Sequence, residues 1–207
     1  MLRVVSHRKI IIITSMLVLL VLFGEKGYAK TKVSGPEIRW AIAHPFIAMK
    51  AKKISERAIY LTDSIEKIGL LADRSGGQLD AFKHTIWMAL LAQSIKPKKA
   101  KKLGMAHEKY NYKMYRKGIG GGDLAASEMD LWNNDVGLII GTSSPDISEN
   151  KLVEIVITAI KQGKMKIVKK DLQGKSLDCE GKLIDNSSLK TWNNNRCLVS
   201  SDYKYNL

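Results

Sequence analysis

The sequence has no apolar run long enough for an ordinary transmembrane helix. Its longest run, residues 10–23, has 14 residues, of which only two carry hydroxyl groups, whereas a spanning helix needs roughly 20 apolar residues. Three basic residues precede the run, and Gly27-Tyr28-Ala29 follows it with small residues where a signal peptidase cleaves. We therefore expect residues 1–29 to be a secretory signal and the protein to be periplasmic or secreted. The alternative is an uncleaved signal, in which residues 10–23 contact the inner membrane and tether the protein there.

Cysteine is equally scarce. The chain has only Cys179 and Cys197, and in an exported protein an isolated pair predicts a disulfide rather than a metal site or a nucleophilic thiol. The bridge would close a loop of about 18 residues and stabilise the protein by about 3 kcal/mol. No cysteine lies near residue 29, so we do not expect a lipoprotein anchor.

Acidic residues are few relative to basic ones, 20 against 34. Removing the four basic residues and the one acidic residue of 1–29 leaves a net charge of +11. Such a charge attracts an anionic envelope component, a phospholipid surface or nucleic acid, although it also serves solubility. We do not favour nucleic acid, because export argues against it and no aromatic residue interleaves the lysine-rich run 96–102.

Helical periodicity dominates the rest of the chain. Apolar residues recur three and four positions apart in five segments, which predicts helices over residues 45–71, 78–95, 97–117, 123–140 and 148–163. Ser34 and Pro36 have the pattern of a further helix start, and residues 165–168 and 182–184 could pair as a hairpin. We therefore expect an all-α, compact bundle of about five helices over residues 30–170, and an irregular tail over 171–207 that the disulfide closes.

Several polar residues lie where these helices should be apolar. They are Asp80, His84 and Trp87 in the helix over 78–95, His107 and Glu108 in the next, and Asp130, Asn133, Asn134 and Gly137 beside the expected core stripe Met129, Trp132, Val136 and Ile139 of the helix over 123–140. Asp80 and His84 are four residues apart, so they share one helix face. Because an ionisable group is costly to bury unless it is paired, the set indicates a functional site.

Two kinds of site are compatible with these residues. One is a site for zinc or another divalent metal, with ligands from Asp80, His84, His107 and Asp130, and His44 as a further candidate. The other is a metal-free acid–base site, with His84, His107, Glu108, Asp130, Asn133 and Asn134 as its catalytic groups. His107-Glu108 has no second histidine four residues on, so the zincin motif is absent.

Each feature also has a structural explanation when it is taken alone. Asp80 and His84 could be a helix-surface pair, His107 a core histidine with satisfied hydrogen bonds, and Asp130 a cap for a neighbouring helix. The occurrence of all of them in one bundle is what favours a site.

Three blocks of sequence resemble a known family. They are residues 77–87 (GQLDAFKHTIW), 104–108 (GMAHE) and 129–137 (MDLWNNDVG). Together they resemble the bacterial domain of unknown function numbered 6973, over about residues 40–170, and His44-Pro45 resembles a pair with which its members often begin. Lys83 stands where the family usually has arginine. The resemblance implies that the polar residues named above form one constellation, and that related domains occur in exported, toxin-like bacterial proteins.

We therefore expect a toxin-like, exported hydrolase that acts on phosphodiester or phospholipid substrates, with His84 and His107 as ligands or acid–base groups and Glu108 activating water. Trinuclear zinc phospholipases use more histidines than the three that follow residue 29, so that likeness is loose. The alternative is a non-catalytic periplasmic or membrane-tethered binding, exclusion or immunity protein. A solvent-open cleft with both histidines would favour the enzyme, and a dry cluster with every polar atom paired would favour the alternative.

Overall fold

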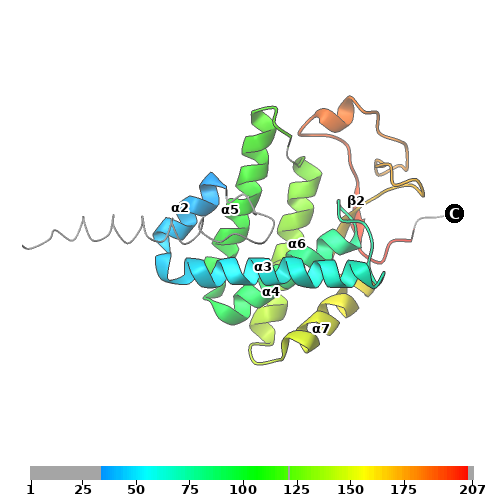
Figure 1. Ribbon diagram of the computed structural model, residues 1–207. Helices are drawn as coiled ribbons and strands as arrows, with labels where there is room; N and C mark the ends of the chain where they lie inside the picture. The colour runs from blue at the N-terminus through cyan, green and yellow to red at the C-terminus, as the bar shows by residue number, and fades with distance from the viewer. Residues whose placement is uncertain (1–33, 121, 205–207) are drawn as a thin grey trace, which may run out of the picture.

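The computed structural model describes residues 34–120 and 122–204, so the predicted signal over residues 1–29 lies outside the described residues. The described chain confirms the all-α prediction (Figure 1). Its helices are α2 (Gly35–Ala43), α3 (Pro45–Lys67), α4 (Gln78–Ser94), α5 (Pro97–Arg116), α6 (Leu124–Ser143) and α7 (Glu149–Lys161). Among these residues, no helix is both long enough and apolar enough to cross a membrane.

Local signals set the starts of the helices. Proline occupies the first position of α3 and of α5, where its missing N–H costs no hydrogen bond. The Asp123 side chain accepts a hydrogen bond from the backbone of Ala126, and Ser148 does the same at the start of α7. The extra helix α2 begins with a capping box in which Ser34 and Glu37 exchange hydrogen bonds.

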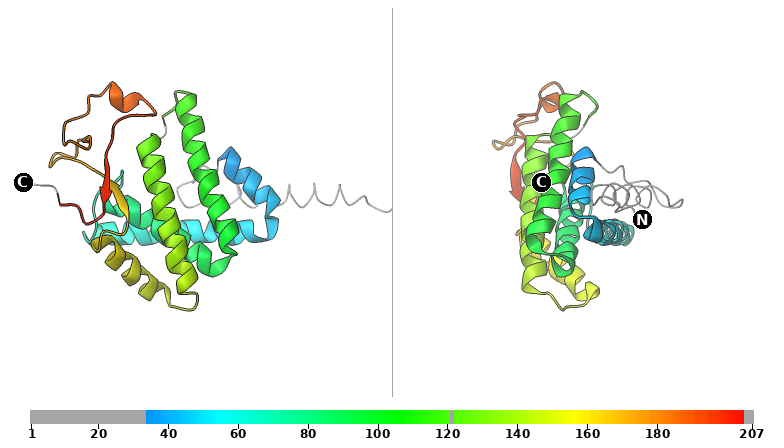
Figure 2. Two further views of the ribbon diagram at one scale, coloured as in Figure 1. Left: turned by 180° about the vertical axis from the view of Figure 1, so that it is seen from behind. Right: turned by 90° about the vertical axis from the view of Figure 1, so that its left-hand side faces the viewer.

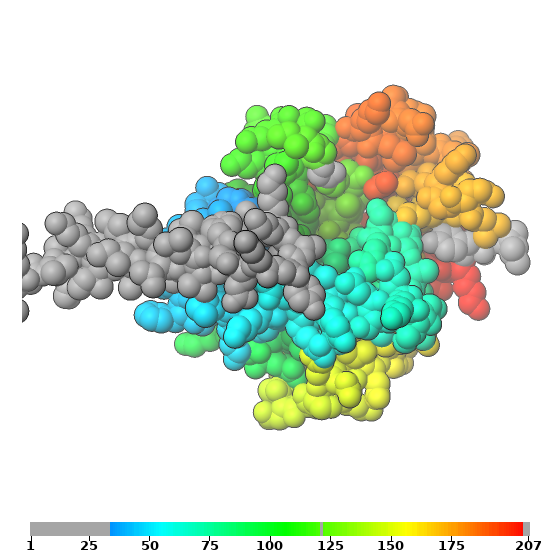
Figure 3. Space-filling model, viewed as in Figure 1, coloured from blue at the N-terminus to red at the C-terminus, as the bar shows by residue number. Residues whose placement is uncertain are grey.

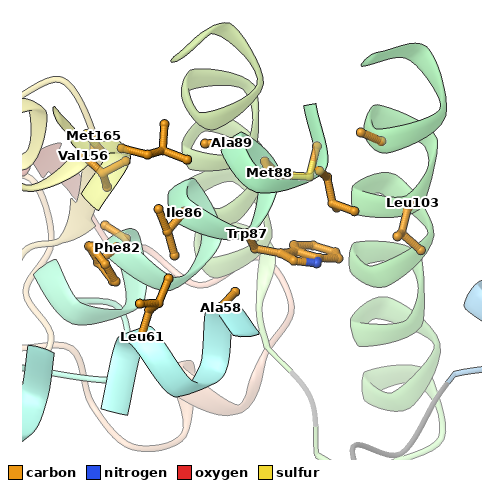
Figure 4. Packing of buried hydrophobic residues seen from close by; sticks show 14 of the residues in the cluster. Ala58, Leu61, Phe82, Ile86, Trp87, Met88, Ala89, Leu103, Val156 and Met165 are labelled. Carbon is orange, nitrogen blue, oxygen red and sulfur yellow. The ribbon is translucent and has the colours of Figure 1, made fainter. Parts of the chain in front are cut away.

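Helix α4 runs through the centre of the bundle, and α3, α6 and α7 pack around it. Phe82 and Ile86 are fully buried on α4, and Figure 4 shows them near Leu61 of α3 and Val156 of α7. Because α4 contacts α3, α5, α6 and α7, residues at its polar positions are held between neighbouring helices rather than in solvent.

Helix α6 contradicts half of the predicted core stripe. Met129 is buried and Val136 is partly buried against the core, as expected, but the other two residues are not. Trp132 and Ile139 are 47% and 65% exposed, whereas Asn133, Asn134 and Gly137 are buried. The reason is the close approach of α6 to α4, since a Cβ atom on Gly137 would lie only 2.2 Å from the carbonyl oxygen of Thr85. The polar face of α6, rather than its most apolar face, therefore packs against the central helix.

The tail forms a two-stranded antiparallel sheet of β1 (Lys166–Val168) and β2 (Leu198–Ser200), with a short 3-10 helix, η1 (Ser188–Lys190), between them. The predicted strand partner, residues 182–184, is wrong. A local turn in which the Asp178 N–H donates to the Lys182 carbonyl folds this segment back, and Leu183 forms only an isolated bridge with Leu177.

The predicted disulfide between Cys179 and Cys197 is confirmed in the structure. The tail that it closes lies against the end of the bundle where α5 and α6 meet (Figure 2). There Trp192 packs on Tyr112 and Tyr115 with ring centroids 4.8 and 5.3 Å away. Asp123 also pairs with Arg196 at 3.0 Å, so the tail is attached to the helices by packing and by charge.

Candidate functional site

The central histidine lies between two carboxylates from two helices. His84 Nε2 is 3.7 Å from Asp80 Oδ1 on its own helix and 3.3 Å from Asp130 Oδ1 on α6. The close packing of α4 on α6 brings these residues together, since both belong to the contacting faces. His84 is only 4% exposed, so the cluster of Asp80, His84 and Asp130 is largely buried.

The three side chains differ in how well they are satisfied. Asp80 is anchored, because its Oδ2 accepts a hydrogen bond from the Gly76 backbone and its Oδ1 lies 2.5 Å from Lys83 Nζ. Within the described residues, His84 Nδ1 and Asp130 Oδ1 have no hydrogen-bond partner. Unpaired buried polar atoms of this kind are costly, and in native proteins they require a functional or ligand-based explanation.

The electrostatics of the cluster follow from burial and from an excess of carboxylates. Burial lowers the pKa of His84 well below its usual value, and the positive charges of Lys83 and His107 add to this effect. Burial also raises the pKa of Asp130 well above its usual value, assisted by the charges of Glu108 and Asp80. Without a ligand, the buried His84 and Asp130 therefore both favour their uncharged forms, and a positive charge placed between them would favour ionised Asp130.

The geometry of the cluster suits a divalent cation. One ligand atom from each of Asp80, His84 and Asp130 lies within 4.8 Å of the others. Ligands bound to one cation at about 2.0–2.6 Å are at most about 5 Å apart. Two carboxylates and one imidazole are also a common donor set for such ions. These three residues are the part of the predicted metal set that the structure brings together.

His107 lies beside this group rather than in it. Its ring centroid is 6.2 Å from that of His84 and 5.7 Å from that of Trp87. Its Nδ1 is 2.8 Å from Glu37 Oε1 on α2. Burial lowers the pKa of His107, but the hydrogen bond and charge of Glu37, with the charge of Glu108, outweigh burial and raise it. Burial raises the pKa of Glu37, but the interactions with His107 and Ser34 outweigh burial and lower it.

Asn133 and Asn134, although adjacent, have different surroundings. The Asn133 amide exchanges two hydrogen bonds with the backbone of Lys166, at 3.0 and 2.9 Å, and so joins α6 to β1. Asn133 is also fully buried and does not line the cleft described below, so it cannot donate to an oxyanion there. Asn134 is buried, and neither of its polar atoms makes a hydrogen bond of ordinary geometry among the described residues. Its side chain nevertheless lies close enough to His84 for a hydrogen-bonding interaction that opposes the lowering of the His84 pKa.

Two other predicted site residues, Glu108 and His44, do not join the cluster. Glu108 is buried, with Oε2 accepting a hydrogen bond from Asn111, and it does not line the cleft described below. Burial raises the pKa of Glu108. His44 is the residue between α2 and α3, where its Nδ1 lies 2.9 Å from the carbonyl oxygen of Trp40. The structure therefore does not bring His44 to the metal ligands.

A cleft of about 850 Å³ opens over the cluster. Both His84 and His107 line it, together with Asp80, Lys83, Asp130 and Arg196. Figure 3 shows the hollow between α5, the tail and the turn before α4. The contributions of Glu37 and the tail were not predicted, because each depends on contacts between segments distant in sequence. Lys83 is only three residues from Asp80, but the sequence analysis noted it only as a difference from the family pattern. The Ser34–Glu37 capping pattern was the only sequence signal near Glu37.

A second cavity, of about 210 Å³, lies on the other side of the histidines and is mainly apolar. It is bounded by α2, α3, α4 and α5, and Lys83, His84 and His107 line both cavities. The polar cleft and the apolar cavity therefore meet at these three side chains.

Comparison with known proteins gives a family but no activity. Residues 38–164 match the model of a family described as Domain of unknown function (DUF6973). No curated protein and no solved structure matches the chain. The matched region contains Asp80, His84, His107 and Asp130, whereas Glu37 and the disulfide lie outside it.

Proposed function

Because this chain belongs to the DUF6973 family, whose function is unknown, its activity has to be inferred from the site, and we propose that it is a phosphodiester hydrolase that uses a divalent cation. The single observation that carries this proposal is the position of His84 Nε2 between Asp80 and Asp130 in the lining of an open cleft. Phospholipids are included among the substrates, since their head groups are joined by phosphodiester bonds.

The unpaired atoms support an enzyme over a scaffold. A cluster that only holds helices together is expected to be dry and fully hydrogen-bonded. Here His84 Nδ1 and Asp130 Oδ1 make no hydrogen bond among the described residues, although Asp130 Oδ1 lies 3.3 Å from His84 Nε2, and both side chains line a cleft. Asn133 provides the contrast of a buried amide with a structural role, because both of its polar atoms are hydrogen-bonded.

The proposed chemistry is the displacement of an alcohol from phosphorus by water. A divalent cation held by Asp80, His84 and Asp130 would supply Lewis acidity and favour ionisation of the attacking water. Lys83, whose side chain is 38% exposed, can turn from Asp80 to a phosphoryl oxygen. As the P–O bond to the leaving group breaks, His107 donates a proton to that oxygen, and Glu37 holds the imidazolium in position. The attacking water adds its oxygen to phosphorus and loses its proton to solvent.

The metal and the activity are tested together in purified protein. We expect about one equivalent of a divalent metal by mass spectrometry and hydrolysis of bis(4-nitrophenyl) phosphate. Asp130→Asn keeps the shape of the side chain and should lower both the metal content and kcat at least a hundredfold. Asp135→Asn is the matched control on the same helix, because Asp135 is exposed and pairs with Lys101, and it should behave as the wild type.

The outcomes separate the parts of the proposal. Activity that survives chelation at full rate would overturn the role of the cation. An Asp130→Asn protein that is folded and fully active would remove the cluster from catalysis. A folded wild-type protein with neither metal nor activity toward phosphodiesters would leave the binding, exclusion or immunity protein as the better hypothesis.

Export is a further part of the proposal, supported by the signal pattern of residues 1–29 and by the basic charge. Expression of the chain with and without these residues, beside a His84→Ala/His107→Ala double variant, tests it. We expect toxicity to the host only for the exported chain with both histidines intact. Equal toxicity of the chain without residues 1–29 would contradict an envelope target.

A further inference from the structure

The apolar cavity beside the histidines is built from small side chains. Along α3, Ala48, Ala51, Ser55 and Ala58 line it at spacings of three and four residues, so they share one face of the helix. A larger residue such as leucine at these positions would fill the space. The sequence therefore leaves room of about 210 Å³ between α3 and the helices opposite it.

Two tryptophans make the opposite walls rigid and apolar. The Trp87 indole N–H donates to Ser55 Oγ at 2.9 Å, and the Trp40 indole N–H donates to the Lys99 carbonyl at 3.1 Å. Figure 4 shows the Trp87 ring between α4 and Leu103 of α5. Since both N–H groups are already paired within the protein, the rings offer mainly apolar surface to a ligand. Whatever occupies this cavity must be apolar there.

The cavity is continuous with the polar site through shared side chains. Lys83, His84 and His107 line both spaces, and His84, at their junction, is only 4% exposed. Lys52 also lines the apolar cavity. A ligand that extends across the junction would place an apolar part among the alanines and an anionic part near Lys83.

We propose that the substrate is a single-chain phosphoamphiphile, whose alkyl or acyl chain lies in the apolar cavity while its phosphate lies in the cleft at Lys83. This inference rests on the proposed function and narrows it to lipid-like phosphodiesters. A flexible chain suits a cavity of this volume between four helices better than a protein helix, whose diameter with side chains is about 10–12 Å. Lys83 at the junction with the cleft fixes the orientation of the chain, because it lines both spaces and attracts the phosphate.

Binding of alkyl phosphates to the wild-type protein is the test. Hexyl, octyl and decyl phosphate are titrated below their critical micelle concentrations and followed by calorimetry. We expect the Kd to fall about fourfold for each methylene that enters the cavity, from about 0.8 kcal/mol per buried methylene. An alkyl phosphate with bromine at the chain end should quench the fluorescence of Trp40 and Trp87, and Trp87→Phe should remove part of the quenched emission.

A matched pair of variants locates the chain. Ala51→Phe places a ring in the cavity and should abolish the dependence of Kd on chain length, whereas Ala43→Phe, at an exposed position that does not line the cavity, should keep it. If Ala51→Phe lowers the Tm, the smaller change Ala48→Leu replaces it. Both variants should retain hydrolysis of bis(4-nitrophenyl) phosphate, which has no alkyl chain.

Failure of this inference and failure of the proposed function give different results. Equal affinity for hexyl, octyl and decyl phosphate would overturn the inference, even if phosphodiester hydrolysis is observed. Chain-length dependence that persists in Ala51→Phe would also overturn it, because the chain would then bind elsewhere. Chain-length dependence in a folded protein without hydrolytic activity would support the cavity as a lipid site and contradict the hydrolase alone.

Discussion

His107 Nδ1 lies 2.8 Å from Glu37 Oε1, and the other oxygen of the same carboxylate accepts a hydrogen bond from the Ser34 backbone at 2.7 Å. One side chain therefore both caps α2 and holds the charge of a histidine at the cleft. This links the first described helix to the candidate site. The contribution of the pair to the stability of the fold should therefore decrease both at acid pH, where Glu37 is protonated, and at alkaline pH, where His107 is neutral.

The first prediction concerns that dependence. The pKa of Glu37 is lowered from 4.5, so its stabilisation is present above about 4.5 and is lost as the pH falls through its lower folded pKa. The pKa of His107 is raised from 6.5, so its stabilisation is present below about 6.5 and is lost as the pH rises through its higher folded pKa. We expect the pair to contribute most between about pH 4.5 and 6.5.

Urea unfolding of the wild type and Glu37→Gln from pH 3 to 9 measures this contribution. The difference should peak in that window at about 1 kcal/mol, a modest value because His107 is 39% exposed. Glu149→Gln is the control, since Glu149 pairs with Arg57, which does not titrate here. The difference in unfolding free energy between the wild type and Glu149→Gln should be constant at neutral and alkaline pH, and it should disappear only toward acid pH. A flat difference for Glu37→Gln would show that the two groups do not interact in solution.

The second prediction contrasts two adjacent amides. Asn133→Ala removes both hydrogen bonds to Lys166 and should lower the free energy of unfolding by about 2–4 kcal/mol. Asn134→Ala breaks no hydrogen bond of ordinary geometry within the described residues, only the weaker interaction with His84, and should change it by less than about 1 kcal/mol. Denaturant unfolding of both variants gives the comparison. Equal losses would mean that Asn134 has a partner that supports the fold.

The third prediction concerns the crossing of α4 and α6. A methyl group on Gly137 would meet the Thr85 carbonyl at 2.2 Å, so Gly137→Ala must push the helices apart. We expect a loss of about 3 kcal/mol or more. Gly35→Ala in α2 is the control, because a methyl group on Gly35 would have no atom of another residue within 4 Å, its chain neighbours aside. A Gly137→Ala protein as stable as the wild type, measured by its Tm, would contradict this helix packing.

Sequence patterns predicted the parts of the fold that depend on neighbours along the chain. Pro45, Pro97, Asp123 and Ser148 mark helix starts through local backbone chemistry, and apolar spacing predicted the helix over residues 78–95 that the structure has as α4. The pairing of β1 with β2 was missed, because these strands are about 30 residues apart and no sequence pattern links them. The strand partner of β1 depends on how the tail packs against the bundle.

The candidate site was predictable in its residue types but not in its roles. Asp80 and His84 share a helix face by spacing alone, and the placement of Asp130 opposite them depends on Gly137, which sets the buried face of α6. Hydrophobicity favoured the face with Trp132 instead, which is largely exposed. Spacing also could not reveal Glu37 as the partner of His107, since 70 residues separate them.

The fourth prediction concerns the tail that forms one side of the cleft. The Cys179–Cys197 bridge closes a loop with a sequence separation of 18, so its reduction, or Cys179→Ser with Cys197→Ser, should cost about 3 kcal/mol. Trp192 packs between the tail and α5, against Tyr112 and Tyr115. Loosening of the tail should therefore expose this indole and shift its fluorescence to longer wavelength, before the helices melt.

Circular dichroism at 222 nm and tryptophan fluorescence separate the two events in one thermal scan of the reduced protein. We expect the fluorescence change at the lower temperature, because α2 to α7 have their own buried core and need no covalent link to the tail. Trp192→Phe is the control and should remove the early change without altering the helical transition. A single coincident transition would instead mean that the tail and the bundle unfold as one cooperative unit, so that the cleft is lost only when the helices melt.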